Sequence, residues 1–247
     1  MRYYIELAYK GTRFHGWQMQ GNAYTVQSEL NRALQVAFRL PISTYGCGRT
    51  DTGVHARQFF AQFDVPEPIE DFDRLVYKLN GILLPDISIF RIFEVESNAS
   101  TRFDAIARTY KYFITTYKSP FLQDFAWYIP TPLDLKKMNR AAKLLTKTTE
   151  FGSFVKANAE TKTNTCYVKE AEFEENPANR TITFTITSNR FLRSMVRTVV
   201  GTLVDVGKGK ISYKEMKAII DSQDRQEASD SAPAAGLFLW AIRYPYI

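Results

Sequence analysis

The stretch GCGRTDTGVHA, residues 46–56, presents one carboxylate, Asp51, in a segment rich in glycine. Three of the 12 glycines of the chain fall between positions 46 and 53. Glycine permits a positive φ and lets another molecule approach the backbone closely, so an acid presented in this way can serve as a catalyst or a metal ligand. An Asp in such a turn can equally cap its own backbone, and the residues alone leave that alternative open.

A second polar residue, Arg197, stands in the apolar run NRFLRSMVRTVVGTLVDVG, residues 189–207. The run predicts a largely buried helix over 190–206, with Arg190, Arg193 and Arg197 on one face because they are three and four residues apart. Buried arginine is rare without an anion. We therefore expect Arg197 to pair with an acid, for which Asp51 is the best candidate, unless its guanidinium reaches solvent.

Hydrophobic periodicity predicts the elements that position these residues. In the first part of the chain it indicates strands over 2–9, 43–47, 57–65 and 86–95, and helices over 25–38 and 70–82. In the second part it indicates strands over 107–117, 165–175, 181–188 and 236–244, and helices over 131–147, 190–206 and 213–221. Thr131 is the expected N-cap of the helix over 131–147, with Pro132 at its first position.

The order of these elements predicts the fold class. It reads β-α-β-β-α-β in the first half, and the second half repeats this order without repeating the sequence. We therefore expect an α+β protein of two ferredoxin-like lobes, residues 1–98 and 99–247, each with four strands and with helices on one face. The crossover between the lobes is expected in residues 97–104.

Composition and charge narrow the setting. The chain has 247 residues, of which 45% are hydrophobic, and a net charge of +6, which fits a polyanionic partner without requiring one. We see no signal peptide and no apolar run near the roughly 18 to 20 residues of a membrane helix. The two cysteines, Cys47 and Cys166, are expected to be thiols in a reducing compartment. These features predict a cytoplasmic protein with no membrane association.

Several cofactor motifs are absent from the sequence. It lacks the phosphate-binding G-x-x-x-x-G-K-[ST] and the dinucleotide-binding G-x-G-x-x-G, since Asp51 stands where the third glycine is needed. It also lacks the zinc deaminase signature, and its His and Cys spacing suits no structural zinc. We therefore expect neither a metal ion nor an organic cofactor.

Five motifs together resemble the tRNA pseudouridine synthase A family, over residues 3–245. Residues 46–56 resemble its G-R-T-D-x-G-V-H-A motif. The other four are FHGWQMQ with TVQSEL (14–20 and 25–30), ARTYKY (107–112), the apolar run at 189–207, and APAAGLFLWAIRYP (232–245). The resemblance implies two α+β lobes that share an antiparallel sheet around a basic cleft, the pseudouridine synthase fold.

The resemblance also implies an activity and its substrate. The family converts uridine to pseudouridine at positions 38, 39 and 40, in the anticodon stem-loop of tRNA, without a cofactor and as a homodimer. Asp51 is then the catalytic residue, acting either as a nucleophile at the sugar or as a base. Arg197 would keep Asp51 ionised, Arg49 would fill the gap that the flipped uridine leaves, and Tyr110 would pack on the target base.

Other residues and other functions stay open. His55 is as well explained by a structural role as by participation, and Trp17 either anchors the first loop or touches RNA. The chain departs from the family pattern at 99–102, 149–151 and 162–163, which lie outside the catalytic motifs and concern RNA contact rather than the chemistry. The alternatives are a catalytically silent RNA-binding module, a synthase acting on another RNA site, and a nucleoside hydrolase, although glycosidases usually need a second carboxylate.

Overall fold

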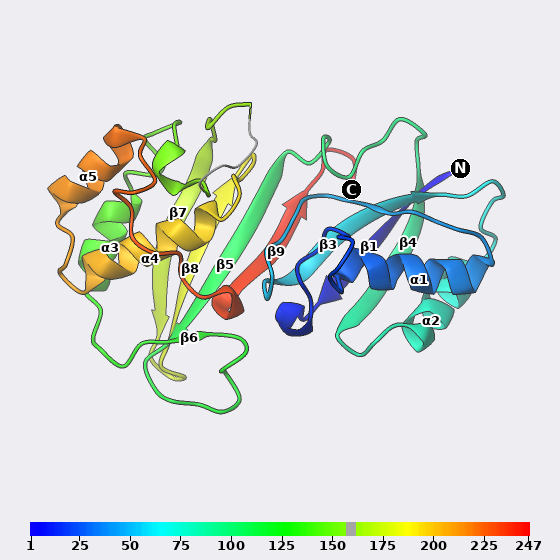
Figure 1. The fold of residues 1–247 in the computed structure, drawn as a ribbon, viewed down its shortest axis with the longest axis horizontal. Helices are drawn as coiled ribbons and strands as arrows, with labels where there is room; N and C mark the ends of the chain where they lie inside the picture. The colour runs from blue at the N-terminus through cyan, green and yellow to red at the C-terminus, as the bar shows by residue number, and fades with distance from the viewer. Residues whose placement is uncertain (157–161) are drawn as a thin grey trace. The chain divides into compact units, whose positions relative to one another are not determined.

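The computed structural model of the chain describes residues 1–156 and 162–247. Helices alternate with mostly antiparallel strands, which confirms the α+β class (Figure 1). Contacts divide the chain into one unit of Met1–Ile106 with Leu239–Ile247 and a second unit of Ala107–Phe238. The contact division thus falls after Ile106, whereas the sequence placed a lobe boundary after residue 98.

The first unit has the β-α-β-β-α-β order that the sequence predicts. Its elements are β1 (Arg2–Tyr9), α1 (Val26–Phe38), β2 (Tyr45–Gly46), β3 (His55–Asp64), α2 (Phe72–Ile82) and β4 (Ile87–Val95), with the 3₁₀ turn Gly11–Arg13. Strand β1 pairs antiparallel with β3 and β4, and β2 pairs with β3. The strand order is β4-β1-β3-β9, where β9 spans Leu237–Arg243 and contributes to this unit from Leu239 on.

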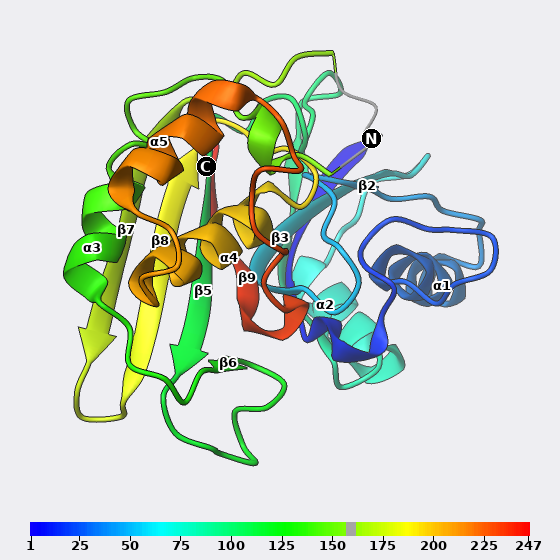
Figure 2. The ribbon, with the colours of Figure 1, turned by 60° about the vertical axis from the view of Figure 1, so that its left-hand side comes forward.

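Both helices of the first unit lie on the same side of its strands (Figures 1 and 2). The Tyr3 ring of β1 packs against Phe72 at the start of α2, with ring centroids 5.9 Å apart. Helix α1 begins at a capping box, in which Thr25 and Ser28 each accept a hydrogen bond from the backbone N–H of the other. This cap fixes the start of α1 and therefore the path of the segment that leads into it.

The second unit pairs its strands in the order β5-β8-β7. Its elements are β5 (Ala107–Thr115), β6 (Trp127–Tyr128), α3 (Leu135–Ala142), β7 (Val168–Asn176), β8 (Thr181–Ser188), α4 (Met195–Gly207) and α5 (Tyr213–Ser222), with 3₁₀ turns at Gly152–Phe154 and Ala234–Gly236. Strand β5 is antiparallel to β8 and parallel to the two-residue β6, which the sequence did not predict. Helices α3, α4 and α5 cover one face of these strands (Figure 2).

Two helices of the second unit begin later than the sequence predicts. Helix α3 is capped by Asp134, whose carboxylate accepts the N–H of Lys137, so Thr131 and Pro132 precede the helix. Helix α4 begins at Met195 because Ser194 has a left-handed backbone with φ 60°. Arg190 and Arg193 therefore lie before α4 and share no helix face with Arg197, which corrects that prediction.

Candidate active site

The loop that carries Asp51 runs from β2 to the start of β3, and its backbone is tied down at both ends. At its start, the N–H of Cys47 donates to the carbonyl of Phe60 over 2.9 Å. At its end, the N–H of Val54 donates to the carbonyl of Asp51 over 3.1 Å, which closes a turn. Gly53 in this turn has φ 78°, a value that favours glycine. The glycines here therefore build a fixed turn around the carboxylate.

The FHGW segment, residues 14–17, holds this loop from the side. The N–H of Trp17 donates to the carbonyl of Thr50, and the N–H of Gly53 donates to the carbonyl of Phe14, both over 3.3 Å. A Cβ on Gly16 would overlap the carbonyl of Thr50, so only glycine allows the approach. The Trp17 ring is 1% exposed and stacks on Phe59 at 4.1 Å. The sequence left open whether Trp17 anchors a loop or touches RNA, and these contacts favour the anchoring role.

His55 also has a structural place. It is buried, and its Nδ1 accepts the backbone N–H of Gly11 over 3.0 Å, so Nδ1 carries no proton in this arrangement. Close by, the hydroxyls of Tyr9 and Thr50 share a hydrogen bond of 2.8 Å. These contacts join the Asp51 loop to the end of β1 and to the turn after it, and they favour the structural role for His55.

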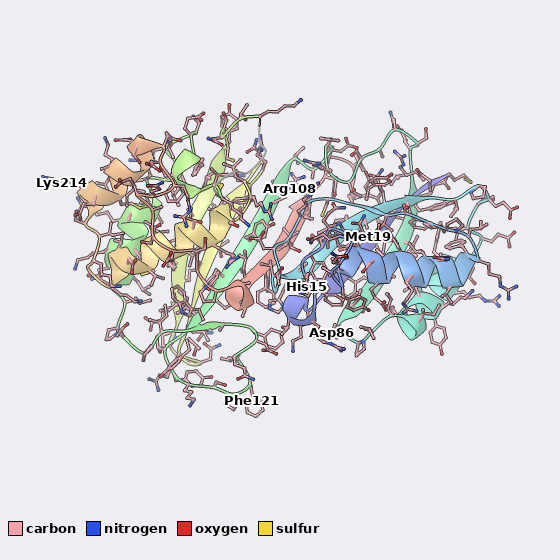
Figure 3. The ribbon with its side chains drawn as sticks, in the orientation of Figure 1. His15, Met19, Asp86, Arg108, Phe121 and Lys214 are labelled. Atoms are coloured by element: carbon pink, nitrogen blue, oxygen red, sulfur yellow. The ribbon has the colours of Figure 1, made fainter. Side chains whose placement is uncertain are left out.

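The side chains that the loop presents differ in exposure. Asp51 is half-buried and Arg49 is exposed. A Cβ on Gly48 would meet no atom within 4 Å, so the loop is open on that side. Figure 3 shows His15 and Met19 on the neighbouring segment that precedes α1. A carboxylate and a guanidinium held two residues apart on a fixed loop can supply a nucleophile or base together with a group that contacts an anion.

Tyr110 of the second unit lies on β5, opposite Ile186 of β8. Its ring meets the ring of Phe191 edge to face, with centroids 5.1 Å apart and an interplanar angle of 89°. The side chain is half-buried, so the Tyr110 ring is supported on one side by Phe191 and remains accessible in part. Phe191 gave no functional signal in the sequence beyond its apolar character.

Arg197 lies on the first turn of α4 and is half-buried. Its Nε donates to the carbonyl of Ala232 over 2.7 Å, and the N–H of Ala232 donates back to the carbonyl of Arg197 over 2.9 Å. The hydroxyls of Thr198 and Ser231 are 2.9 Å apart. The segment around Ala232 thus orients the Arg197 guanidinium, and the sequence missed this because a backbone acceptor can belong to any residue type.

Tyr112 fixes the same segment from β5. Its side chain is fully buried and its hydroxyl donates to the carbonyl of Pro233 over 2.8 Å. Burial raises the pKa of Tyr112, and the nearby charge of Arg197 opposes that rise. The phenol is therefore neutral at physiological pH and can donate this hydrogen bond. A Cβ on Gly236 would press on the Tyr112 ring, so glycine permits the close approach of the chain here.

The sequence-predicted residues thus fall into two groups. Asp51 and Arg49 share one loop of the first unit, and Tyr110 and Arg197 belong to the second. The ion pair expected between Asp51 and Arg197 joins residues of different units and stays a prediction. Among the described residues, no group of three or more His, Cys, Asp or Glu side chains could hold a metal ion. No helix of the described ranges is long and apolar enough to cross a membrane.

Comparison with known proteins places the chain in a family. A family model described as tRNA pseudouridine synthase matches residues 141–245. The tRNA pseudouridine synthase A of Bacteroides fragilis is 46% identical over 244 residues, which cover 99% of this chain and 96% of that protein. The protein of the same name from Porphyromonas gingivalis is 43% identical over 99% of this chain, and that from Fervidobacterium nodosum 37% identical over 97%. The chain therefore belongs to the tRNA pseudouridine synthase A family.

Proposed function

We propose that this protein is a cofactor-independent isomerase that converts uridine to pseudouridine in tRNA, with Asp51 as its catalytic residue. The observation that carries the proposal is the half-buried carboxylate on a loop tied to Phe14, Trp17 and Phe60, in a chain that aligns over almost its full length with proteins named for this activity. A fixed loop suits catalysis because the reacting group must be held close to the productive geometry.

The reaction asks for a single carboxylate. The N1–C1′ bond of uridine breaks, the base turns, and C5 bonds to C1′. The proton on C5 is then lost while N1 gains one, so that mass is conserved. Asp51 serves either as the nucleophile at C1′ or as the base that removes a proton. In this proposal Arg197 pairs with Asp51, Tyr110 packs on the target base, and Arg49 occupies the space that the flipped uridine leaves.

The proposal extends to the architecture around the site. Two ferredoxin-like lobes, residues 1–98 and 99–247, share an antiparallel sheet, and a basic cleft between them receives the RNA. The protein acts as a homodimer in the cytoplasm. The family resemblance supports each point, and the buried Cys47 and Cys166, which form no disulfide, fit a reducing compartment. Light scattering of the purified protein tests the dimer, and a monomer at micromolar concentration would refute it.

The proposed targets are uridines 38, 39 and 40 in the anticodon stem-loop. Three successive positions differ in height and rotation along an A-form stem, so recognition must rely on shape and on phosphate contacts. The test maps pseudouridine in tRNA from cells that lack the protein. Loss at positions 38 to 40 is expected. If these positions keep pseudouridine and another site loses it, the target assignment is wrong although the isomerase chemistry stands.

The reaction class has its own test. Purified protein is incubated with uridine-containing tRNA, and the RNA mass and free uracil are measured. Isomerisation leaves the mass unchanged and releases no uracil, while chemical derivatisation of pseudouridine reports the product. Released uracil would identify a nucleoside hydrolase. Tight binding of tRNA without either product would identify a silent RNA-binding module.

A further inference from the structure

Gln27 is a buried amide in the first turn of α1, and both ends of its side chain are hydrogen-bonded. It is 6% exposed, and the apolar Val26 and Leu30 of the same helix are also buried. Its Oε1 accepts from the Nε2 of Gln18 over 2.9 Å and from the N–H of Met19 over 2.7 Å. Its Nε2 donates to the carbonyl of Thr44 over 2.6 Å. A buried amide satisfied in this way links three separate segments of the chain.

Two of these segments flank the Asp51 loop. Thr44 immediately precedes β2, from which the loop departs, and it is anchored to α1 because its N–H and hydroxyl both donate to Oδ1 of Asn31, over 3.0 and 2.8 Å. On the other side, the N–H of Gln27 donates to the carbonyl of Trp17 over 3.0 Å, and Trp17 in turn holds Thr50. The contacts of Gln27 therefore close a ring that runs from Thr44 through β2 and the first part of the loop to Thr50, and back through Trp17.

Stability alone is a weak explanation for this arrangement. Thr44 keeps its two bonds to Asn31 without Gln27, and Trp17 keeps its stack on Phe59. What the Gln27 side chain adds is to fix the Thr44 segment and the Trp17 segment relative to each other. Catalysis is sensitive to such a relation, because a displacement of about 1 Å at a reacting group can cost about 100-fold in rate.

We propose that Gln27 is a positioning residue for Asp51: its side-chain amide holds the segment before β2 and the Trp17–Met19 segment in the register that places the carboxylate. The inference rests on the proposed isomerase function. It assigns Gln27 no contact with the substrate. Its loss should therefore lower the rate of the chemical step and leave the affinity for tRNA unchanged.

The test compares two substitutions under single-turnover conditions. Gln27→Met keeps the bulk of the side chain and removes all three of its hydrogen bonds. Gln27→Glu keeps the acceptor for Gln18 and Met19 but, when ionised, cannot donate to Thr44. We expect each to lower the rate of pseudouridine formation by roughly 10- to 100-fold, with the Kd for tRNA changed by less than about twofold. Gln35→Glu, at an exposed position of the same helix, makes the same charge change and should keep the full rate.

The pH profile separates positioning from general destabilisation. In the Gln27→Glu variant, protonation of the introduced carboxyl restores a donor for the Thr44 carbonyl. The rate of Gln27→Glu relative to wild type should therefore rise as the pH is lowered, whereas that of Gln27→Met should not. Melting temperatures confirm that each variant is folded during the assay.

Three outcomes would overturn the inference. A wild-type rate in Gln27→Met would show that the hydrogen bonds of the Gln27 side chain are dispensable for catalysis. A parallel loss of rate and tRNA affinity that follows the unfolded fraction would reduce Gln27 to a stability role. A wild-type protein that binds tRNA and forms no pseudouridine would refute the proposed function and this inference with it, whereas the first two results leave that function intact.

Discussion

At the scale of single residues, the proposed chemistry depends on one carboxylate whose surroundings are fixed by backbone hydrogen bonds. Asp51→Asn keeps the size of the side chain and removes its ability to act as nucleophile or base. We expect it to bind tRNA with wild-type affinity and to lose activity at least about 100-fold, since such a group contributes several kcal/mol to lowering the barrier. Asp73→Asn, at an exposed position of α2, is the control. Residual activity above a hundredth of wild type would remove Asp51 from the central role.

Arg197 is predicted to matter for both stability and chemistry. Arg197→Met deletes the hydrogen bond from Nε to the Ala232 carbonyl, which should lower the free energy of unfolding by about 2 kcal/mol, the range for a charged donor. If Arg197 also pairs with Asp51, the pH–rate profile should shift. Arg193→Met, exposed and outside α4, should change neither property. An unchanged melting temperature with an unchanged profile would show that Arg197 acts in neither way.

At the scale of elements, the strongest sequence patterns predicted the structure closely. The strands over 2–9 and 181–188 have the predicted bounds, and β8 alternates between half-buried and buried residues along its whole length. The start of α4 could not be predicted, since the left-handed backbone of Ser194 depends on tertiary contacts that residue type does not reveal. Strand β6 was missed because two residues carry no periodicity.

For the candidate site, the sequence proposes residues whose roles stay predictions. The glycine pattern pointed to Asp51 directly. The anchoring role of Trp17 could not be separated from RNA contact, because burial is a tertiary property, and the acceptor at Ala232 is a backbone atom that leaves no mark in the sequence. The buried hydrogen bonds of the Gln27 side chain could not be predicted for a related reason: a polar residue at the start of a helix is ordinarily solvated.

Helix α4 offers a prediction about close packing of elements. A Cβ on Gly201 would overlap the backbone carbonyl of Asp230, in the segment that also carries Ala232. Gly201→Ala should therefore destabilise the protein by about 1 to 3 kcal/mol, as overpacking does, and should lower activity by displacing the acceptor of Arg197. Gly81→Ala, in α2 with no atom within 4 Å of the added Cβ, should be neutral or stabilising by up to about 1 kcal/mol. Chemical denaturation of both variants measures the difference, and equal stabilities would contradict the packing argument.

At the scale of the whole molecule, the net charge of +6 and the proposed shape-based recognition predict how tRNA is bound. The Kd should rise steeply with salt, in proportion to the number of phosphates neutralised. Because a stem-loop offers only part of these phosphates, it should be a poorer substrate than whole tRNA. Asp51→Asn should show the same salt slope as wild type, since it leaves the cations intact. A salt-independent Kd, or equal kcat/KM for the stem-loop and the whole tRNA, would contradict this prediction.

The return of residues 239–247 to the first unit has a consequence for biosynthesis. The ribosome makes the Asp51 loop early, yet the strand segment that completes its unit emerges only after all of Ala107–Phe238 has been translated. Tyr244 and Tyr246 then dock, through hydrogen bonds from their hydroxyls to Thr101 and Asp104. Domains generally fold as units during synthesis. The first unit is therefore complete only when its last strand has been made, whereas the whole of the second unit has been made before that strand. A nascent chain stalled before residue 239 would therefore carry the Asp51 loop without the complete unit that supports it.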